Sequence, residues 1–192
     1  MNVVLPRRLI GPIAISGDPW LPTTAVLPTF LLAFATLLLS CGDVRVALFW
    51  PANAVILALL LQTAARYWWR TLAAGAVGLL LAGVIDGDLS VTSALLSASN
   101  LLEAALSAML IRFATRAEID LGRPKHLAAL FVATASAPAG SAFCAALLLS
   151  ERRGEPFGHT FGAWYLGDAA GLLLLTPLLL LASRVFLQRE RS

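Results

Sequence analysis

Five polar residues recur at helical spacing inside an otherwise apolar stretch of the chain. They are separated by four, three, three and four positions, and they are Ser93, Ser97, Asn100, Glu103 and Ser107. Such spacing puts all of them on one face of a helix. A carboxyl group at membrane depth costs roughly 2.5–3.5 kcal/mol on insertion scales, so it persists where partners or a function offset that cost. Asn100 and Glu103 are therefore the first candidates for binding a ligand or a proton.

Two other apolar stretches supply polar groups at a comparable depth. The segment FWPANA contains Asn53, and the segment FGAWYLGDAAG contains Asp168. At a rise of about 1.5 Å per residue, Asn53 and Asp168 would lie roughly 12 Å from the outer ends of their spans. Asn100 would lie roughly 15 Å in, with Glu103 about one turn deeper. We therefore predict that these four side chains meet in one polar layer.

The chemistry of this layer depends on what neutralises its acids. No Lys or Arg lies at that depth, so Glu103 and Asp168 lack an obvious cationic partner. Burial and close approach disfavour two ionised carboxyls, so either they share a proton or a bound cation, amine or partner protein completes the site. A polar clasp that only fixes helix packing remains an alternative. Trp50 and Trp164 either anchor the chain at the membrane interface or line a pocket.

The remaining motifs do not indicate an enzyme. His126 and His159 fall on opposite sides of the membrane, and Cys41 and Cys144 lie in separate apolar stretches without metal spacing or a disulfide pattern. There is no nucleophile elbow, phosphate-binding glycine loop or HExxH motif. We predict no catalytic residues, no metal and no cofactor.

Composition points to an integral membrane protein. Hydrophobic residues make up 59% of the 192 positions, charged residues 13%, and the mean hydropathy is +0.82. A soluble domain has roughly 45–50% apolar and about 25% charged residues. The net charge of +3 arises from basic residues at the edges of the apolar stretches, which indicates topology signals and not nucleic-acid binding.

The apolar stretches do not alternate in the way a membrane barrel requires, so helices are expected. We predict an all-α polytopic transmembrane bundle with about six spans, at residues 23–40, 46–65, 67–85, 90–111, 126–150 and 160–183. Residues 1–22 would form a short cytoplasmic lead, 23–185 the membrane domain, and 186–192 a basic cytoplasmic tail. Eleven basic residues against three place both termini in the cytoplasm.

Small residues and prolines are expected to govern how the helices pack. The small residues Ala74, Gly78 and Ala82 recur every four positions, and so do Ala133, Ala137 and Ser141. Such faces allow close helix approach. Pro138 should kink its helix. The predicted hinge and packing residues are Pro51, Pro138, Gly167, Gly171 and Pro177.

Three segments together resemble a known family. LFWPANAVILALLL, SNLLEAALSAMLIRF and WYLGDAAGLLLLTPLLLL resemble, in order and spacing, the first class of the membrane-associated sensor (MASE) domains. The resemblance implies a sensory module of the bacterial inner membrane, with residues 23–185 as its sensor domain. It also implies a histidine kinase, diguanylate cyclase or phosphodiesterase output domain in cis or in trans. The given sequence departs from that pattern, because no further membrane helices and no output domain follow Pro177 in it, so we expect either a stand-alone short version or the front part of a longer receptor.

We therefore expect a signal-input module that binds an unidentified ligand or a proton between its helices. The alternative from another class is a small transporter component that binds substrate and needs an energising partner. A scaffold without a ligand is the third reading. The expected partners are the lipid bilayer and the output domain, with a homodimer as a further option and no nucleic acid.

Overall fold

The computed structural model describes residues 13, 15–39, 49–88, 90–116 and 118–189, with side chains as far as residue 184. The chain is 84% helical, and no strand occurs in the described ranges. The helices are α1 (Val26–Leu39), α2 (Ala52–Gln62), α3 (Trp68–Ile85), α4 (Val91–Thr115), α5 (Pro124–Arg153) and α6 (Phe157–Arg189). Two short 3-10 helices, Leu21–Ala25 and Ala65–Tyr67, precede α1 and α3. The predicted all-α bundle is confirmed.

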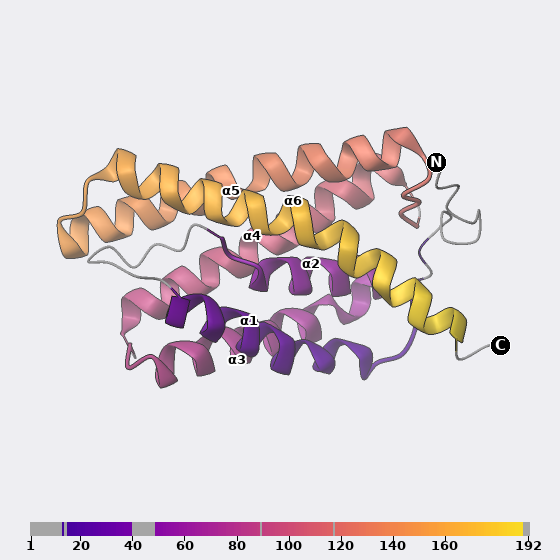
Figure 1. Ribbon diagram of the computed structural model, residues 1–192, viewed down its shortest axis with the longest axis horizontal. Coiled ribbons are helices and arrows are strands. Elements are labelled where there is room, and N and C mark those ends of the chain that lie inside the picture. The colour runs from indigo at the N-terminus through magenta and orange to yellow at the C-terminus, as the bar shows by residue number, and fades with distance from the viewer. Residues whose placement is uncertain (1–12, 14, 40–48, 89, 117, 190–192) are drawn as a thin grey trace, which may run out of the picture.

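Consecutive helices run antiparallel along the length of the bundle (Figure 1). The α3–α4 and α5–α6 connections lie at one end, and the α4–α5 connection and the end of α6 lie at the other. Helix α2 lies between the pair formed by α1 and α3 and the layer formed by α4, α5 and α6, and it contacts α1, α3, α4 and α6. Helix α2 is therefore enclosed by helices from both parts of the bundle.

Among the described residues, five helical segments are long and apolar enough to cross a membrane, and α2 is a shorter apolar helix. The predicted second span covered residues 46–65, of which 46–48 lie outside the described residues. The helix itself has 11 residues, or roughly 16 Å at 1.5 Å per residue, about half of a hydrocarbon core of roughly 30 Å. Nine of the 11 are buried, because α2 is surrounded by protein and not by lipid.

The other helices begin and end within a few residues of the predicted spans, and several are longer. Helix α5 begins at Pro124, where proline suits the first helical turn. Helix α6 runs 33 residues to Arg189, so helix continues into the predicted tail. That length corresponds to roughly 50 Å.

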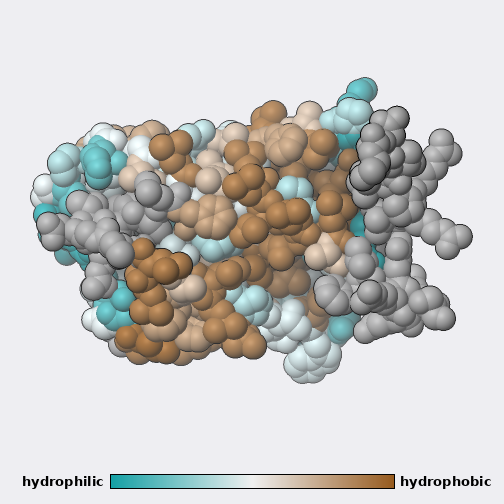
Figure 2. Space-filling model, viewed as in Figure 1, coloured by the Kyte–Doolittle hydropathy of each residue, from teal (hydrophilic) through white to brown (hydrophobic). Residues whose placement is uncertain are grey.

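The surface supports membrane insertion. Figure 2 shows a broad band of mostly apolar residues across the middle of the face in view, with hydrophilic residues gathered toward its two ends. Many large apolar side chains of the described helices are exposed, as Phe113 at 85% and Leu102 at 71% illustrate. A soluble monomer does not leave such a continuous apolar belt open to water. The chain is a multi-pass membrane protein.

The predicted small-residue faces lie at helix contacts. Ala74, Gly78 and Ala82 are all buried on α3. A methyl group built at Gly78 would lie only 2.8 Å from the backbone oxygen of Val26 in α1. The absence of a side chain at Gly78 therefore allows the close contact between α1 and α3.

Candidate functional site

The polar stripe on α4 turns inward at its centre. Ser90 begins the helix, and its hydroxyl accepts a hydrogen bond from the backbone N–H of Ser93 at 3.1 Å. Asn100 and Glu103 are 3% and 2% exposed, and Ser107 is fully buried. The helical spacing seen in the sequence thus predicted the buried face of α4.

Asn53 links α2 to this stripe. Its side-chain N–H group donates to Asn100 Oδ1 at 3.3 Å and to Glu103 Oε1 at 3.1 Å. Asn53 is fully buried on the first turn of α2. One amide therefore uses both of its N–H bonds to hold α2 against α4.

Ser141 on α5 joins the two acids. Its hydroxyl donates to Glu103 Oε2, and it lies 3.5 Å from Asp168 Oδ2 on α6. A hydroxyl has one proton, so Ser141 can donate to only one of the carboxyls at a time. Asp168 is 2% exposed. We call Asn53, Asn100, Glu103, Ser141 and Asp168 the polar centre.

The structure thus brings together the four polar residues that the sequence singled out, and it adds a fifth. Ser141 was predicted only as a small residue at a packing face. The sequence signal that could have identified it is a hydroxyl on the buried face of α5, in line with Ala133 and Ala137. That signal is weak, because a serine also serves as a small residue at helix contacts.

Burial of the polar centre costs free energy. Within the described part of the chain, neither Glu103 nor Asp168 takes part in an ion pair with a basic side chain. The buried atoms Asn53 Oδ1 and Trp50 Nε1 have no hydrogen-bond partner among the residues that the structure describes. An unsatisfied buried polar atom costs about 1–3 kcal/mol. An arrangement that retains such atoms invites a functional explanation.

A backbone contact fixes the start of α2 against α6. The N–H of Trp50 donates to the carbonyl oxygen of Gly167 at 3.0 Å. A methyl group added at Gly171 would collide with the carbonyl group of Trp50. Because Pro51 follows directly, α2 begins at Ala52 against this groove. Gly167 and Gly171 thus lie where the sequence predicted close packing.

The two other predicted hinges lie inside helices. Pro138 lies within α5 and Pro177 within α6. Proline lacks the N–H that a helix interior uses, so each helix loses the hydrogen bond to the carbonyl group four residues before its proline, that of Thr134 in α5 and that of Leu173 in α6. Ser141 Oγ lies 3.0 Å from the carbonyl oxygen of Pro138, and the Tyr165 hydroxyl donates to that of Ala135 at 3.0 Å. Their role as hinges stays a prediction.

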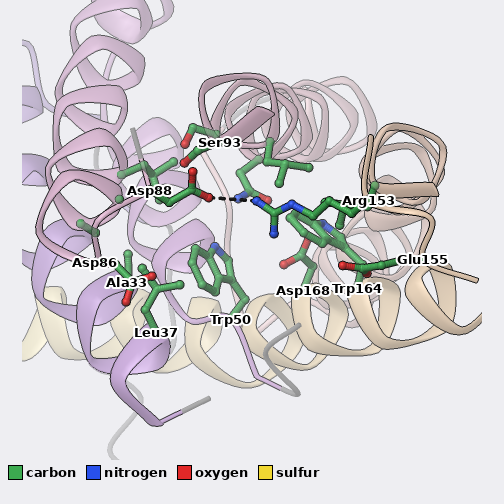
Figure 3. A pocket seen from close by; sticks show the side chains of 17 residues that line it. Ala33, Leu37, Trp50, Asp86, Asp88, Ser93, Arg153, Glu155, Trp164 and Asp168 are labelled. Carbon is green, nitrogen blue, oxygen red and sulfur yellow. Dashed lines mark hydrogen bonds and ion pairs between the residues drawn. The ribbon is translucent and has the colours of Figure 1, made fainter. Parts of the chain in front are cut away.

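A cavity leads from one end of the bundle to the polar centre (Figure 3). Its volume is about 130 Å³, and Asn100 and Asp168 form its deep part. Trp50 and Trp164 both contribute to its wall. The structure therefore places both tryptophans at a cavity, which was one of the two readings of the sequence.

The rim of the cavity carries an ion pair that the sequence did not suggest. Arg153, at the end of α5, donates to Asp88 Oδ2 at 3.1 Å (Figure 3). The pKa of Asp88 is lowered, chiefly by its side-chain hydrogen bond with Ser90 and further by the charge of Arg153, against the opposing effect of partial burial. In the sequence, Arg153 counted only as a topology signal, because its partner is 65 residues away.

Metal ligation finds no support in the described ranges, where no three His, Cys, Asp or Glu side chains are grouped to hold an ion. His126 instead accepts a hydrogen bond from the backbone N–H of Asp120 at 3.0 Å through Nδ1. This contact stabilises the turn before α5.

Comparison with known proteins identifies the family. The MASE1 family profile matches residues 21–192, so the chain belongs to the MASE1 family of membrane-associated sensor domains. The resemblance found in the sequence is thereby confirmed. No match was found among curated proteins or among solved structures.

Proposed function

We propose that this chain is a signal-input module of the bacterial inner membrane whose polar centre changes state when it takes up a proton or a small ligand. The observation that carries the proposal is the meeting of Glu103 and Asp168 around Ser141, without a basic partner in the described ranges. Two buried carboxyls that compete for one hydroxyl form a group whose charge can change at low structural cost. A sensor needs such an element, because a ligand shifts an equilibrium only by its differential affinity for two states.

When the polar centre changes state in this proposal, α4 and α6 repack around α2, which is the central moving element. It is held at its start by Gly167 and Gly171, and through Asn53 by Glu103. These contacts connect α2 to α4 and α6. A change of charge on Glu103 or Asp168 therefore alters the hydrogen bonds that position α2. Asn53 Oδ1 has no hydrogen-bond partner among the described residues, so a second arrangement that pairs it would gain a hydrogen bond.

Helix α6 would carry the change onward. It contains Asp168 and continues for 21 more residues to Arg189, or roughly 32 Å along its axis. Its far end lies at the end of the bundle that contains the α4–α5 connection (Figure 1). Arg116 and Arg123 lie in that connection and Lys125 lies in the first turn of α5, so the positive-inside rule supports a cytoplasmic location for this end. A histidine kinase, diguanylate cyclase or phosphodiesterase, in cis or in trans, would receive the signal there.

The titratable neighbours are few. Around Glu103 lie Asn53, Asn100, Ser141 and Asp168, of which only Asp168 carries a carboxyl group. The other charged side chains of the cavity stand at its rim, and they are Asp86, Asp88, Arg153 and Glu155. A pH response of the centre would therefore be that of the pair Glu103 and Asp168.

The test is a distance measurement across pH. Spin labels at Leu102 on α4 and Leu174 on α6, both lipid-facing at 71% and 60% exposure, report the separation of these helices in nanodiscs. We expect two distance populations whose ratio changes with pH in the wild type, and one fixed population in Glu103→Gln. An unchanged distribution in the wild type at every pH, with and without candidate ligands, would leave the centre as a static clasp.

Partner identity needs a separate measurement. Cross-linking and co-purification from the native membrane should recover a kinase, cyclase or phosphodiesterase. Recovery of an ATPase, or substrate accumulation in vesicles, would instead support the transporter alternative.

A further inference from the structure

The cavity above the polar centre has the chemistry of a cation site. Its lining includes four carboxyl groups and one guanidinium group. The acids are Asp86, Asp88, Glu155 and Asp168, and the base is Arg153. Because Arg153 already pairs with Asp88, it does not neutralise the deeper acid Asp168. The field inside the cavity therefore favours a positive ligand.

The deep end offers both an acceptor and a donor. Asp168 is 2% exposed and lines the cavity, and Ser141 reaches its Oδ2 only at 3.5 Å while donating to Glu103. Asn100 is 3% exposed and also lines the cavity. Its oxygen accepts from Asn53, whereas its own N–H group has no acceptor among the described residues. A ligand with a positive group and a nearby oxygen would use both side chains.

Aromatic rings form part of the wall. Figure 3 shows the indoles of Trp50 and Trp164 on different elements around the cavity, with Asp168 close to Trp164. Aromatic faces attract ammonium groups by about 0.5–2 kcal/mol, depending on desolvation, without requiring an ion pair. The half-buried Ser93 and Ser97 add hydroxyl groups between the rim and Asn100. Size also restricts the ligand, because about 130 Å³ is well below the several hundred Å³ of pockets for drug-sized molecules.

We infer that this cavity binds a small organic ammonium compound that carries a hydroxyl or other oxygen acceptor, with its ammonium group at Asp168 and its oxygen at Asn100. The inference deepens the proposed function, since it gives a ligand class to the site next to the polar centre. Entry would be from the end of the bundle that holds the α3–α4 and α5–α6 connections. Binding would place a positive charge beside the two acids and so favour their ionised forms.

The test uses three molecules of almost equal size. Ethanolamine, ethylene glycol and glycolate present a positive, a neutral and a negative group on the same two-carbon frame. Binding to the purified full chain in nanodiscs is measured by calorimetry and thermal shift at constant ionic strength. We expect saturable stabilisation by ethanolamine, and at least tenfold weaker binding of the other two. Equal effects of all three, or no effect of ethanolamine, would overturn the inference.

Variants locate the site. Asp168→Asn should weaken ethanolamine binding at least tenfold, and Trp164→Leu should weaken it several-fold while keeping an apolar wall. Glu151→Gln is the matched control, because Glu151 is exposed on the last turns of α5, does not line the cavity, and loses the same charge. If Glu151→Gln weakens binding as much as Asp168→Asn does, the attraction is a general surface effect and the site assignment is wrong.

Should Asp168→Asn fail to fold, Trp164→Leu and a comparison of ethanolamine with ethylamine decide the matter. The wild type should prefer ethanolamine, because ethylamine cannot use the N–H group of Asn100, and equal affinity would refute the assigned pose. The outcome is also separable from the proposed function. If ethanolamine binds without changing the distance between α4 and α6, the binding site is supported and the proposed change of state is refuted. If the distance changes with pH but ethanolamine does not bind, the proposed change of state is supported and this ligand class is refuted.

Discussion

The side-chain amide of Asn53 donates to Oε1 of Glu103 at 3.1 Å, although the two residues are 50 positions apart in the sequence. The contact joins the first turn of the buried helix α2 to the middle of α4. Asn53 also donates to Asn100, so this one amide makes two of the hydrogen bonds between these two helices. Both ends of this contact are nearly inaccessible to solvent, which makes its loss difficult to compensate with water.

A double-mutant cycle measures this contact. Asn53→Ala removes the donor and leaves Glu103 Oε1 unsatisfied, so we expect the free energy of unfolding to fall by about 1–3 kcal/mol. The combination with Glu103→Ala should cost less than the sum of the single changes by about 0.5–3 kcal/mol. Unfolding of the chain in mixed detergent micelles provides the four values. Strict additivity would show that the two side chains do not interact in solution.

The contact of Gly171 with Trp50 predicts a position-specific effect of one methyl group. Gly171→Ala would drive its new carbon into the carbonyl group of Trp50, so we expect destabilisation of about 1–3 kcal/mol or more. Gly162→Ala is the control on the same helix, because nothing lies within 4 Å of its added carbon. There, alanine should be neutral or should stabilise α6 by up to about 1 kcal/mol. Thermal unfolding compares the two, and equal melting temperatures would contradict the close crossing.

These contacts show what the sequence could and could not reveal. The inward face of α4 was predictable because the spacing of Asn100 and Glu103 is a local property of one helix. Their depth relative to Asp168 was predictable because all spans cross the same bilayer, so depth can be counted in residues from the outer end of each span. By contrast, the roles of Ser141 and Arg153 depend on which helices are neighbours. Hydropathy along one chain does not specify helix neighbours.

The length of α2 illustrates the same limit. Residues 46–65 are as apolar as a membrane span, so hydropathy alone could not distinguish a lipid-facing helix from one enclosed by protein. Pro51 marked the start of the helix, but the extended conformation at Thr63 that ends it has no strong sequence signal. The enclosure of α2 follows from the groove at Gly171 and from contacts beyond Gln62, which are tertiary.

The Asp88–Arg153 pair predicts a stability change in mild acid. The pKa of Asp88 is lowered in the folded chain, chiefly by Ser90 and further by Arg153. Its contribution is therefore present above the unfolded-state pKa of about 3.9 and is lost as the pH falls through the folded value. The side chains are 38% and 43% exposed, so we expect less than about 1 kcal/mol, reduced by salt.

The measurement for this pair is the melting temperature of wild type and Asp88→Asn between pH 3 and pH 6. The wild type should be the more stable at pH 6, and the difference should shrink toward pH 3. A difference that is constant across this range would indicate that the carboxylate charge of Asp88 contributes nothing.

Arg112 closes the opposite end of α2, and it provides the last prediction. Its Nη2 donates to the carbonyl oxygens of Leu60, Leu61 and Thr63 at 3.1, 3.2 and 2.6 Å, and its guanidinium lies 5.4 Å from the ring centre of Trp68. The last carbonyls of a helix lack internal donors and carry its partial negative charge. Arg112→Gln should therefore free the C-terminal turn of α2, at a cost of about 1.5–3 kcal/mol for hydrogen bonds to a charged group.

Hydrogen exchange of the amides in α2 reports this change directly. A loss of about 1.4 kcal/mol corresponds to a tenfold faster exchange, so we expect at least that increase in the last turn of α2. Arg112→Lys should give an intermediate rate, because an ammonium group keeps the charge but cannot match the planar geometry of the guanidinium. Arg116→Gln is the control, since Arg116 is exposed at the end of α4, the helix that also carries Arg112. Equal exchange in Arg112→Gln and Arg116→Gln would mean that α2 is held by packing alone, and that its C-terminal end is free of the clasp formed by Arg112.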